Sequence, residues 1–305
     1  MRRNRIERAL PWAAVIAVFL LMTIGNVVSA TGSGLACPDW PLCHGRLIPP
    51  LRADVLIEYS HRLTAMVASV LVVAMGIVTV RTARVSGTRR LGIALLILLG
   101  VQIGLGGVTV LLRLPHVIST AHLVTALLIL GALLLLTARF GEQDGPRVLV
   151  PRIARLARVG LAVLLFQLAL GGYVRHTGAG LACPDFPLCS GHVLPEHWLG
   201  VLHGAHRWLG VALLGFFAHM AIASRGTSVA RAAATTAVLA VSQVGLGIAT
   251  VLFQLDPFVR ATHAAVGYTL WGVLVWLCTR AGSWHALLAF RGRIRKPAAE
   301  VVHAS

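Results

Sequence analysis

The sequence contains few charged residues, and acidic residues are especially scarce. Of its 305 residues, 10 are Asp or Glu and 27 are Lys or Arg, so only 12% are charged, whereas 57% are hydrophobic. The length alone would suit one large or two modest soluble domains, but this composition and a mean hydropathy of +0.82 exclude them. The sequence indicates an integral membrane protein.

Aromatic residues are also scarce, at 6%, and none is interleaved with the arginine clusters. The net charge of +17 therefore does not indicate a nucleic-acid surface, which would need aromatic stacking platforms among the basic residues. The basic clusters lie between apolar runs: Arg2, Arg3, Arg5 and Arg8; Arg81, Arg84, Arg89 and Arg90; Arg147, Arg152, Arg155 and Arg158; Arg225 and Arg231; Arg291, Arg293, Arg295 and Lys296. By the positive-inside rule we expect these clusters and both termini on the cytoplasmic side of a bacterial cell membrane.

Apolar runs of the roughly 20 residues that a bilayer-spanning helix needs occur along the whole chain. They begin near Pro11, Leu56, Leu91, Val117, Ala157, Trp198, Ala233 and Val259. The prediction is an all-α integral membrane protein with eight transmembrane helices, four in each half. The first run resembles a secretory signal that ends at Ser29-Ala30. We expect it to be retained, because Leu161 to Val174 occupies the same place in the second half.

One motif occurs twice. Thr31-Gly-Ser-Gly-Leu-Ala-Cys-Pro-Asp-Trp-Pro-Leu-Cys43 returns as Thr177-Gly-Ala-Gly-Leu-Ala-Cys-Pro-Asp-Phe-Pro-Leu-Cys189. Such similarity indicates an internal duplication, so we expect two pseudosymmetric four-helix bundles. The predicted divisions are an N-terminal bundle (1–140), a cytoplasmic linker (141–156), a C-terminal bundle (157–282) and a cytoplasmic tail (283–305).

Four of the five cysteines belong to these motifs, in loops expected on the oxidising, extracytoplasmic side. We expect the disulfides Cys37–Cys43 and Cys183–Cys189, each stabilising its loop by roughly 2 kcal/mol. A metal site and a redox relay within each pair are the alternatives. Cys278 is expected to be a packing residue.

Histidines recur at matching positions inside the apolar runs. They are His61 and His122 in the first half, and His206 and His263 in the second. An ionisable side chain in a membrane helix is costly and marks a functional candidate. Two imidazoles facing each other across a four-helix bundle can ligate a haem iron, so we expect one haem in each half. Zinc or copper is the competing metal, but those sites usually have three or four protein ligands.

Arg62 and Arg207 directly follow the first histidine of each half. Because arginine suits bidentate carboxylate binding, we expect both to contact haem propionates. The alternative is that they extend to the membrane interface. In the third span of each half, glycines in Gln102–Thr109 and Gln243–Thr250 predict close approach between helices.

Glu58 is the one acidic residue expected within an apolar span, three residues before His61 on the same helical face. The second half has His203 instead. Pairing with Arg62 or with nearby backbone is the alternative role for Glu58. Because two haems that only transfer electrons would not need this difference, we infer that the first pocket carries out chemistry and the second holds a permanent cofactor.

Together, these motifs resemble the haem A synthase family over all eight spans. The resemblance implies conversion of haem O to haem A for terminal oxidases, by oxidation of a ring methyl group to a formyl group. It implies that Glu58 is the catalytic carboxylate and that the four histidines bind haem iron: His61 and His122 that of the substrate haem O, His206 and His263 that of a haem b cofactor. The family's outer disulfide matches Cys37 and Cys43. The chain departs from the family pattern in one respect, since Arg175 matches a motif arginine where the first half has Ser29.

The expected partners are haem O and the enzyme that makes it, together with the lipid bilayer and no nucleic acid. A homo-oligomer is left open, and the sequence does not identify the electron-transfer partner. The alternative function is a di-haem b-type membrane cytochrome that exchanges electrons with quinone without modifying haem. A non-catalytic haem-handling assembly factor is a third reading.

Overall fold

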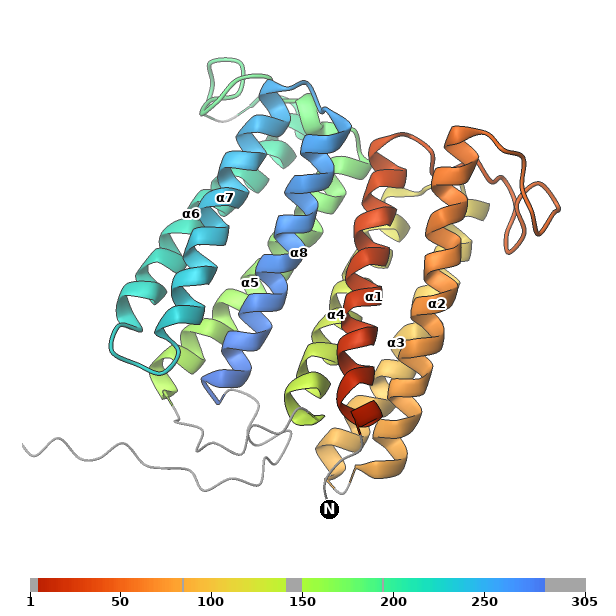
Figure 1. Cartoon of the computed structure of the whole chain (residues 1–305). Helices are drawn as coiled ribbons and strands as arrows, with labels where there is room; N and C mark the ends of the chain where they lie inside the picture. Colours follow the sequence, from red (N-terminus) through yellow and green to blue (C-terminus); the bar gives the residue numbers. More distant parts are fainter. Residues whose placement is uncertain (1–4, 84, 141–149, 194, 283–305) are drawn as a thin grey trace, which may run out of the picture.

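The computed structural model describes residues 5–83, 85–140, 150–193 and 195–282, and these residues form a bundle of long helices (Figure 1). The helices are α1 (Arg5–Ala30), α2 (Ala53–Thr82), α3 (Ser86–Leu111), α4 (His116–Phe140), α5 (Pro151–His176), α6 (Trp198–Ala223), α7 (Ala230–Leu252) and α8 (Pro257–Arg280), with a short 3₁₀ turn η1 (Ala179–Leu181). All eight are long and apolar enough to cross a membrane, and no β-strand occurs within the described ranges. The prediction of an all-α, eight-span membrane protein is confirmed.

Local signals set where these helices begin. Pro151 and Pro257 stand at the first turn of α5 and α8, where a missing N–H costs nothing. Asp256 caps α8, because its carboxylate accepts hydrogen bonds from the amides of Phe258 and Val259 at 2.9 and 3.1 Å. These starts fix the depth of every side chain along α5 and α8.

Each half of the chain closes into a ring of four helices. In the first half α1 contacts α2, α2 contacts α3, α3 contacts α4, and α4 returns to α1. The second half repeats this order with α5, α6, α7 and α8. This arrangement is compatible with the predicted duplication. The predicted tail, 283–305, and most of the predicted linker, 141–156, lie outside the described residues, so those divisions stay predictions.

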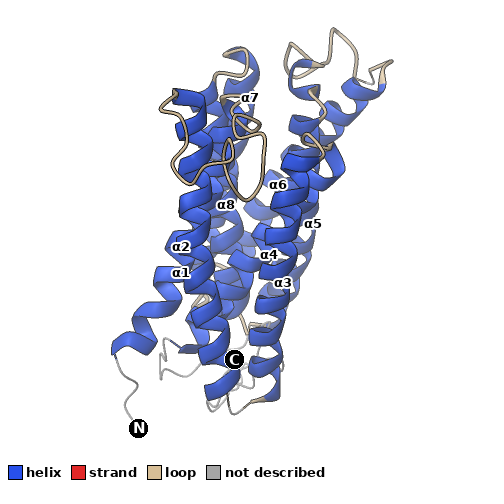
Figure 2. Cartoon of the chain, turned by 90° about the vertical axis from the view of Figure 1, so that its right-hand side faces the viewer, coloured by secondary structure: helices blue, strands red, loops and turns tan. Residues whose placement is uncertain are grey.

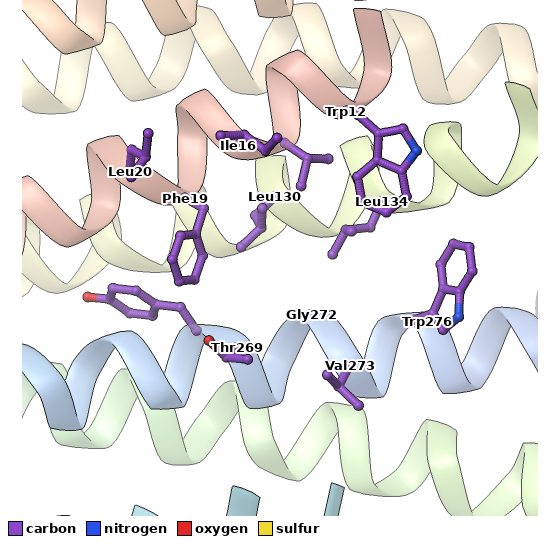
Figure 3. Close-up of a pocket in the computed structure, with 12 residues that line it drawn as sticks. Trp12, Ile16, Phe19, Leu20, Leu130, Leu134, Thr269, Gly272, Val273 and Trp276 are labelled. Atoms are coloured by element: carbon purple, nitrogen blue, oxygen red, sulfur yellow. The ribbon is translucent and has the colours of Figure 1, made fainter. Parts of the chain in front are cut away.

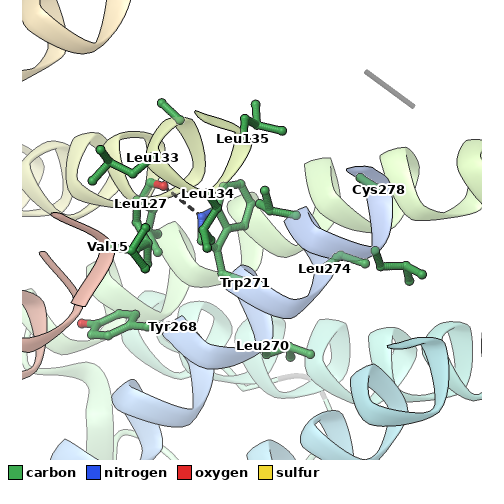
Figure 4. Close-up of a cluster of buried hydrophobic side chains, with 14 of the residues drawn as sticks. Val15, Leu127, Leu133, Leu134, Leu135, Tyr268, Leu270, Trp271, Leu274 and Cys278 are labelled. Atoms are coloured by element: carbon green, nitrogen blue, oxygen red, sulfur yellow. Dashed lines mark hydrogen bonds between the residues drawn. The ribbon is translucent and has the colours of Figure 1, made fainter. Parts of the chain in front are cut away.

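The two bundles meet along a seam formed by α1, α4, α5 and α8. Helix α4 is the most buried of the eight spans. The indole N–H of Trp271 on α8 donates to the carbonyl oxygen of Leu127 on α4 at 2.9 Å, within a cluster of leucines (Figure 4). A largely apolar groove of about 480 Å³ also lies at the seam, between α1, α4 and α8, and none of the four histidines lines it (Figure 3).

Both cysteine loops lie at one face of the molecule, which we call the cysteine-loop face, and α1 begins at the opposite face (Figure 2). Several of the arginines predicted to be cytoplasmic stand at helix ends on that opposite face, namely Arg81, Arg89, Arg90, Arg152, Arg155, Arg158, Arg225 and Arg231. Arg2, Arg3, Arg84, Arg147 and the arginines beyond residue 282 lie outside the described residues. The chain is a multi-pass membrane protein, and which face is cytoplasmic remains a prediction.

Candidate functional site

Two disulfide-closed loops cover the start of α2 and α6. The S–S distances are 1.95 Å for Cys37–Cys43 and 2.03 Å for Cys183–Cys189, as the sequence predicts. Each loop holds a cis peptide bond before its second proline, at Trp40–Pro41 and Phe186–Pro187. Cys278, also as predicted, is buried.

An aspartate fixes the same backbone geometry at the tip of each loop. His44 and Gly45 both have positive φ angles, and their amides donate to the two carboxylate oxygens of Asp39 at 2.6 and 2.7 Å. Asp185 binds the amides of the second loop in the same way, at 2.6 and 3.1 Å. The amide of Gly45, followed by that of His44, holds the pKa of Asp39 below its usual value.

Arg62 and Arg207 fasten these loops to the helices below them. The guanidinium of Arg62 donates to the carbonyl oxygens of Cys37, Asp39 and Leu42 at 2.5 to 3.0 Å. Arg207 does the same with the carbonyl oxygens of Cys183, Asp185 and Leu188, at 2.5 to 3.2 Å. These hydrogen bonds do not test the predicted contact with haem propionates. They show that both arginines hold a cysteine loop in place.

Glu58 lies buried beneath the first loop, with 4% of its surface exposed. Its Oε2 accepts from the amide of Cys37 at 2.7 Å, and its Oε1 pairs with Arg62 at 2.6 Å. The carboxylate therefore joins the disulfide loop, the arginine and α2, one turn before His61. These contacts are the ones considered as the alternative role for Glu58, and they leave its catalytic role a prediction.

His203 occupies the same place beneath the second loop. Its Nδ1 faces the amide of Cys183 at 3.3 Å, and its Nε2 faces the Nε–H of Arg207 at 3.2 Å. A neutral imidazole has one acceptor nitrogen, so it can accept only one of these two hydrogen bonds at a time. The second loop is consequently held less firmly than the first, where both oxygens of a carboxylate accept.

The four histidines lie at matching depths below the cysteine-loop face. His61 and His206 each follow the first residue of their helix by eight positions, and His122 and His263 by six. At a rise of 1.5 Å per residue, these depths are about 12 and 9 Å. Electrostatic interaction links His61 with His122 and His206 with His263, so each bundle brings its two imidazoles together.

Every one of these rings lies against a glycine of the neighbouring helix. A Cβ added at Gly25 or Gly171 would come within 2.7 or 2.6 Å of the Cε1 atom of His61 or His206. At Gly106 and Gly247 it would come within 3.2 and 3.3 Å of His122 and His263. We call these four glycines the glycine ledges.

The ledges correct an expectation about the third span of each half. Its glycines were expected to allow close approach between helices, but Gly104 and Gly245 face open space, while Gly106 and Gly247 face a histidine ring. Gly107 instead receives the indole of Trp40 from the cysteine loop. The sequence carries one sign that Gly25 and Gly171 are equivalent: they stand four residues before Ser29 and Arg175, which occupy the same position in the two halves. Only an alignment of the two halves reveals it.

The four histidines can be compared with the ligands that haem iron, zinc and copper usually have in proteins. Nδ1 of all four histidines is buried and has no hydrogen-bond partner within the described residues. No cluster of three or more His, Cys, Asp or Glu side chains that could hold a metal ion occurs in that part of the chain. Isolated pairs of imidazoles in a dry bundle do not match zinc or copper sites with three or four ligands, but they fit two axial ligands of a haem iron.

Glutamines accompany the second histidine of each pair. Nε2 of Gln102 lies 3.3 Å from Nε2 of His122, and Nε2 of Gln243 lies 3.4 Å from Nε2 of His263. Both glutamines stand at the start of a glycine run, and the sequence alone predicted no role for them. Their amides help to orient the two rings.

Comparisons with known proteins agree with this arrangement. A family model described as cytochrome oxidase assembly protein matches residues 8–275. The haem A synthase of Symbiobacterium thermophilum is 32% identical over 289 residues, covering 89% of this chain and 94% of that protein. Those of Bacillus licheniformis and Geobacillus thermodenitrificans are 29% and 30% identical, covering 89% and 96% of this chain and 94% and 95% of their own lengths. The chain therefore belongs to the haem A synthase family of cytochrome oxidase assembly proteins.

Proposed function

We propose that this protein is a haem A synthase that oxidises a methyl group of haem O to a formyl group, giving haem A for terminal oxidases. The observation that carries this proposal is the difference between Glu58 and His203 beneath two nearly identical loops. Each lies one turn from a histidine of a buried pair, but only the first is a carboxylate. The comparisons do not support the alternative of a di-haem cytochrome.

In this proposal the two bundles hold different haems. His61 and His122 bind the iron of the substrate haem O, and His206 and His263 bind the iron of a resident haem b. When bound, haem b supplies one-electron redox chemistry next to the substrate pocket. The glycine ledges leave room for each imidazole in its orientation, because a Cβ would collide with the ring at Gly25 and Gly171 and would crowd it at Gly106 and Gly247.

Glu58 acts on protons in the substrate pocket. Written with water as the oxygen source, two successive hydroxylations of the methyl group release four protons and four electrons, and the hydrated aldehyde then loses water to give the formyl group. The electrons leave to the electron-transfer partner, and a positioned carboxylate can accept the protons one at a time. The Cys37 amide and Arg62 use one lone pair on each oxygen of Glu58, and the second lone pair on each remains for such a proton. Positive charge that develops at the methyl carbon is also favoured beside this carboxylate.

The cysteine loops close the pockets. Each is tightened by a disulfide and tied by an arginine to the helix that carries the first histidine. We place these loops in the extracytoplasmic compartment and both termini in the cytoplasm, because the arginine-rich helix ends lie on the other face. The partners in this proposal are haem O with its synthase and an electron-transfer partner of unknown chemistry.

The deciding experiment replaces Glu58 by Gln and His203 by Gln in parallel. Gln has nearly the same shape as Glu and can still accept the Cys37 amide hydrogen bond, but it cannot take up a proton at neutral pH. With a co-expressed source of haem O, we expect Glu58→Gln to retain bound haem and to form haem A at least about 100-fold more slowly, the lower range for acid–base catalysis. Extracted haems are separated and quantified by chromatography.

His203→Gln is the matched control, because it changes the corresponding position under the second loop. It should leave haem A formation close to that of the unaltered protein. Undiminished haem A in Glu58→Gln would contradict the catalytic assignment. Haem b accumulating alone in the unaltered protein, with haem O unchanged, would favour the cytochrome instead.

A further inference from the structure

Arg62 and Arg207 have few hydrogen-bond donors left for a ligand. A guanidinium has five N–H groups. Arg62 uses its NH1 and NH2 groups for three loop carbonyls and Glu58. Arg207 makes three bonds to loop carbonyls and one to His203. A haem carboxylate could therefore form paired hydrogen bonds with either residue only by displacing a loop carbonyl or the group beneath the loop.

Two other arginines lie at the seam between the bundles, where both reach the last turns of α1. Arg175 on α5 and Arg260 on α8 are both partly buried, and they reach carbonyl oxygens only four residues apart on α1, those of Asn26 and Ala30. The two guanidinium groups also interact electrostatically. Two like charges in a poorly solvated place repel each other unless an anion joins them. Neither arginine forms an ion pair with a carboxylate of the described residues.

Both arginines keep free donors. Arg175 donates to the side-chain oxygen and the carbonyl oxygen of Asn26, and its Nε is buried without a partner in the described part of the chain. Within the described residues, the Arg260 side chain makes one hydrogen bond, a long one from NH1 to the carbonyl oxygen of Ala30 at 3.5 Å. Several N–H groups therefore remain for a ligand with two or more acceptor oxygens.

Their position relates them to the second histidine pair. Arg260 precedes His263 by three residues, and Arg175 follows Gly171, the ledge of His206, by four. Each is thus about one helical turn closer to the cysteine-loop face than the layer that holds the imidazoles. A group bound between the imidazoles could extend its acidic edge to both guanidinium groups.

We propose that Arg175 and Arg260 bind the propionate carboxylates of the haem held by His206 and His263, and that they thereby retain this haem as a permanent cofactor. The inference rests on the proposed function for the identity of that ligand. Arginine recognises carboxylates through paired N–H donors, and such charge-assisted bonds are strong.

The first half lacks both arginines. Ser29 stands where the second half has Arg175, two residues before the repeated threonine, and Ser119 stands where it has Arg260, three residues before the histidine. The hydroxyl of Ser119 is buried and finds no partner among the described residues. A substrate pocket has to release its product, so weaker binding of the haem carboxylates suits the first half. The second half retains its haem, and stronger carboxylate binding suits it.

The test compares free-acid haem b with its dimethyl ester, in which both carboxylates are blocked. The full-length protein, depleted of haem, carries His61→Ala and His122→Ala so that only the second pair binds. The Kd of each compound is measured from the Soret absorption. We expect the free acid to bind at least about tenfold more tightly than the ester, and Arg175→Gln with Arg260→Gln to abolish this preference while the affinity for the ester is retained.

Asn26→Ala is the control for a merely structural contact, because it removes the side-chain partner of Arg175 and leaves both charges. It should preserve the preference for the free acid. Equal affinity of the unaltered arginine pair for acid and ester overturns the proposal, and this result does not require the double variant to fold. An unchanged preference in a folded double variant also overturns it.

A phospholipid phosphate is the other anion that two arginines could hold. Mass spectrometry of the purified protein would then find a lipid that the double variant loses, without any preference between acid and ester, and the proposal would fail. These readouts concern binding only. Failure of the protein with His61 and His122 intact to form haem A, while the preference for the free acid is present, would instead count against the proposed function.

Discussion

In both halves a cysteine amide and an arginine donate to one buried side chain beneath the cysteine loop, but that side chain differs between the halves. In the first half a carboxylate accepts from the loop amide and from the arginine at 2.7 and 2.6 Å. In the second an imidazole faces the same two donors at 3.3 and 3.2 Å and can accept from only one at a time. The two loops have nearly the same sequence and structure, whereas the buried polar side chain beneath them differs. Similar loops therefore do not imply the same chemistry in the two pockets.

The largest expected effect comes from cutting the arginine ties in each half. Arg62→Gln removes three carbonyl contacts and leaves Glu58 buried without its cation, so we expect it to destabilise the protein by about 3 kcal/mol. Arg207→Gln leaves only a neutral histidine behind, for which about 1 to 2 kcal/mol is expected. Thermal unfolding in one detergent compares the variants, and equal losses would contradict the described difference.

The glycine ledges offer a second test, within each half. Gly25→Ala and Gly171→Ala place a methyl group 2.7 and 2.6 Å from a histidine ring, so we expect at least a tenfold loss of haem affinity, about 1.4 kcal/mol, within the range for overpacked sites. Gly106→Ala and Gly247→Ala, at 3.2 and 3.3 Å, should cost less. Haem per protein after purification is the measurement.

Gly104→Ala and Gly245→Ala are the matched controls for the ledges, because nothing lies within 4 Å of a Cβ at either position. They should retain the haem content of the unaltered protein. If the controls lose as much haem as Gly25→Ala and Gly171→Ala, the loss comes from α-helix packing in general and the ledges have no special role.

A smaller effect is expected from making the second half resemble the first. His203→Glu supplies two acceptor oxygens for Cys183 and Arg207, and should stabilise the second loop by about 1 kcal/mol. Hydrogen exchange at the Cys183 amide should slow, whereas haem A formation should not change. Faster exchange would show that the carboxylate does not fit there.

The smallest effect is one that the halves should share. The amides of Gly45 and Ser190, first among their neighbours, lower the pKa of Asp39 and Asp185 in the folded protein. Their contribution to loop stability is therefore full above the unfolded value of 3.8 and is lost as the pH falls through the lowered folded values. Proteolysis of both loops should increase together in acid, and Asp39→Asn should remove this pH dependence from the first loop alone.

The sequence predicted the architecture well, because apolar runs of about 20 residues and a near-perfect repeat are strong signals. It also predicted the disulfides and the recurrence of the four histidines. The partners of Arg62 and Arg207 could not be predicted, because they are backbone carbonyls whose directions depend on how the loops fold. Gly25 and Gly171 were missed as ledges for a similar reason, since a helix pattern does not reveal which glycine faces a ring on the next helix.

The ledges have a consequence for engineering. Each imidazole is oriented by a residue on a different helix, with His61 on α2 against Gly25 on α1 and His263 on α8 against Gly247 on α7. Moving a single histidine-bearing helix into another scaffold would therefore transfer the ligand without its orientation. The smallest portable unit of this site is a pair of adjacent helices, and a complete site requires two such pairs.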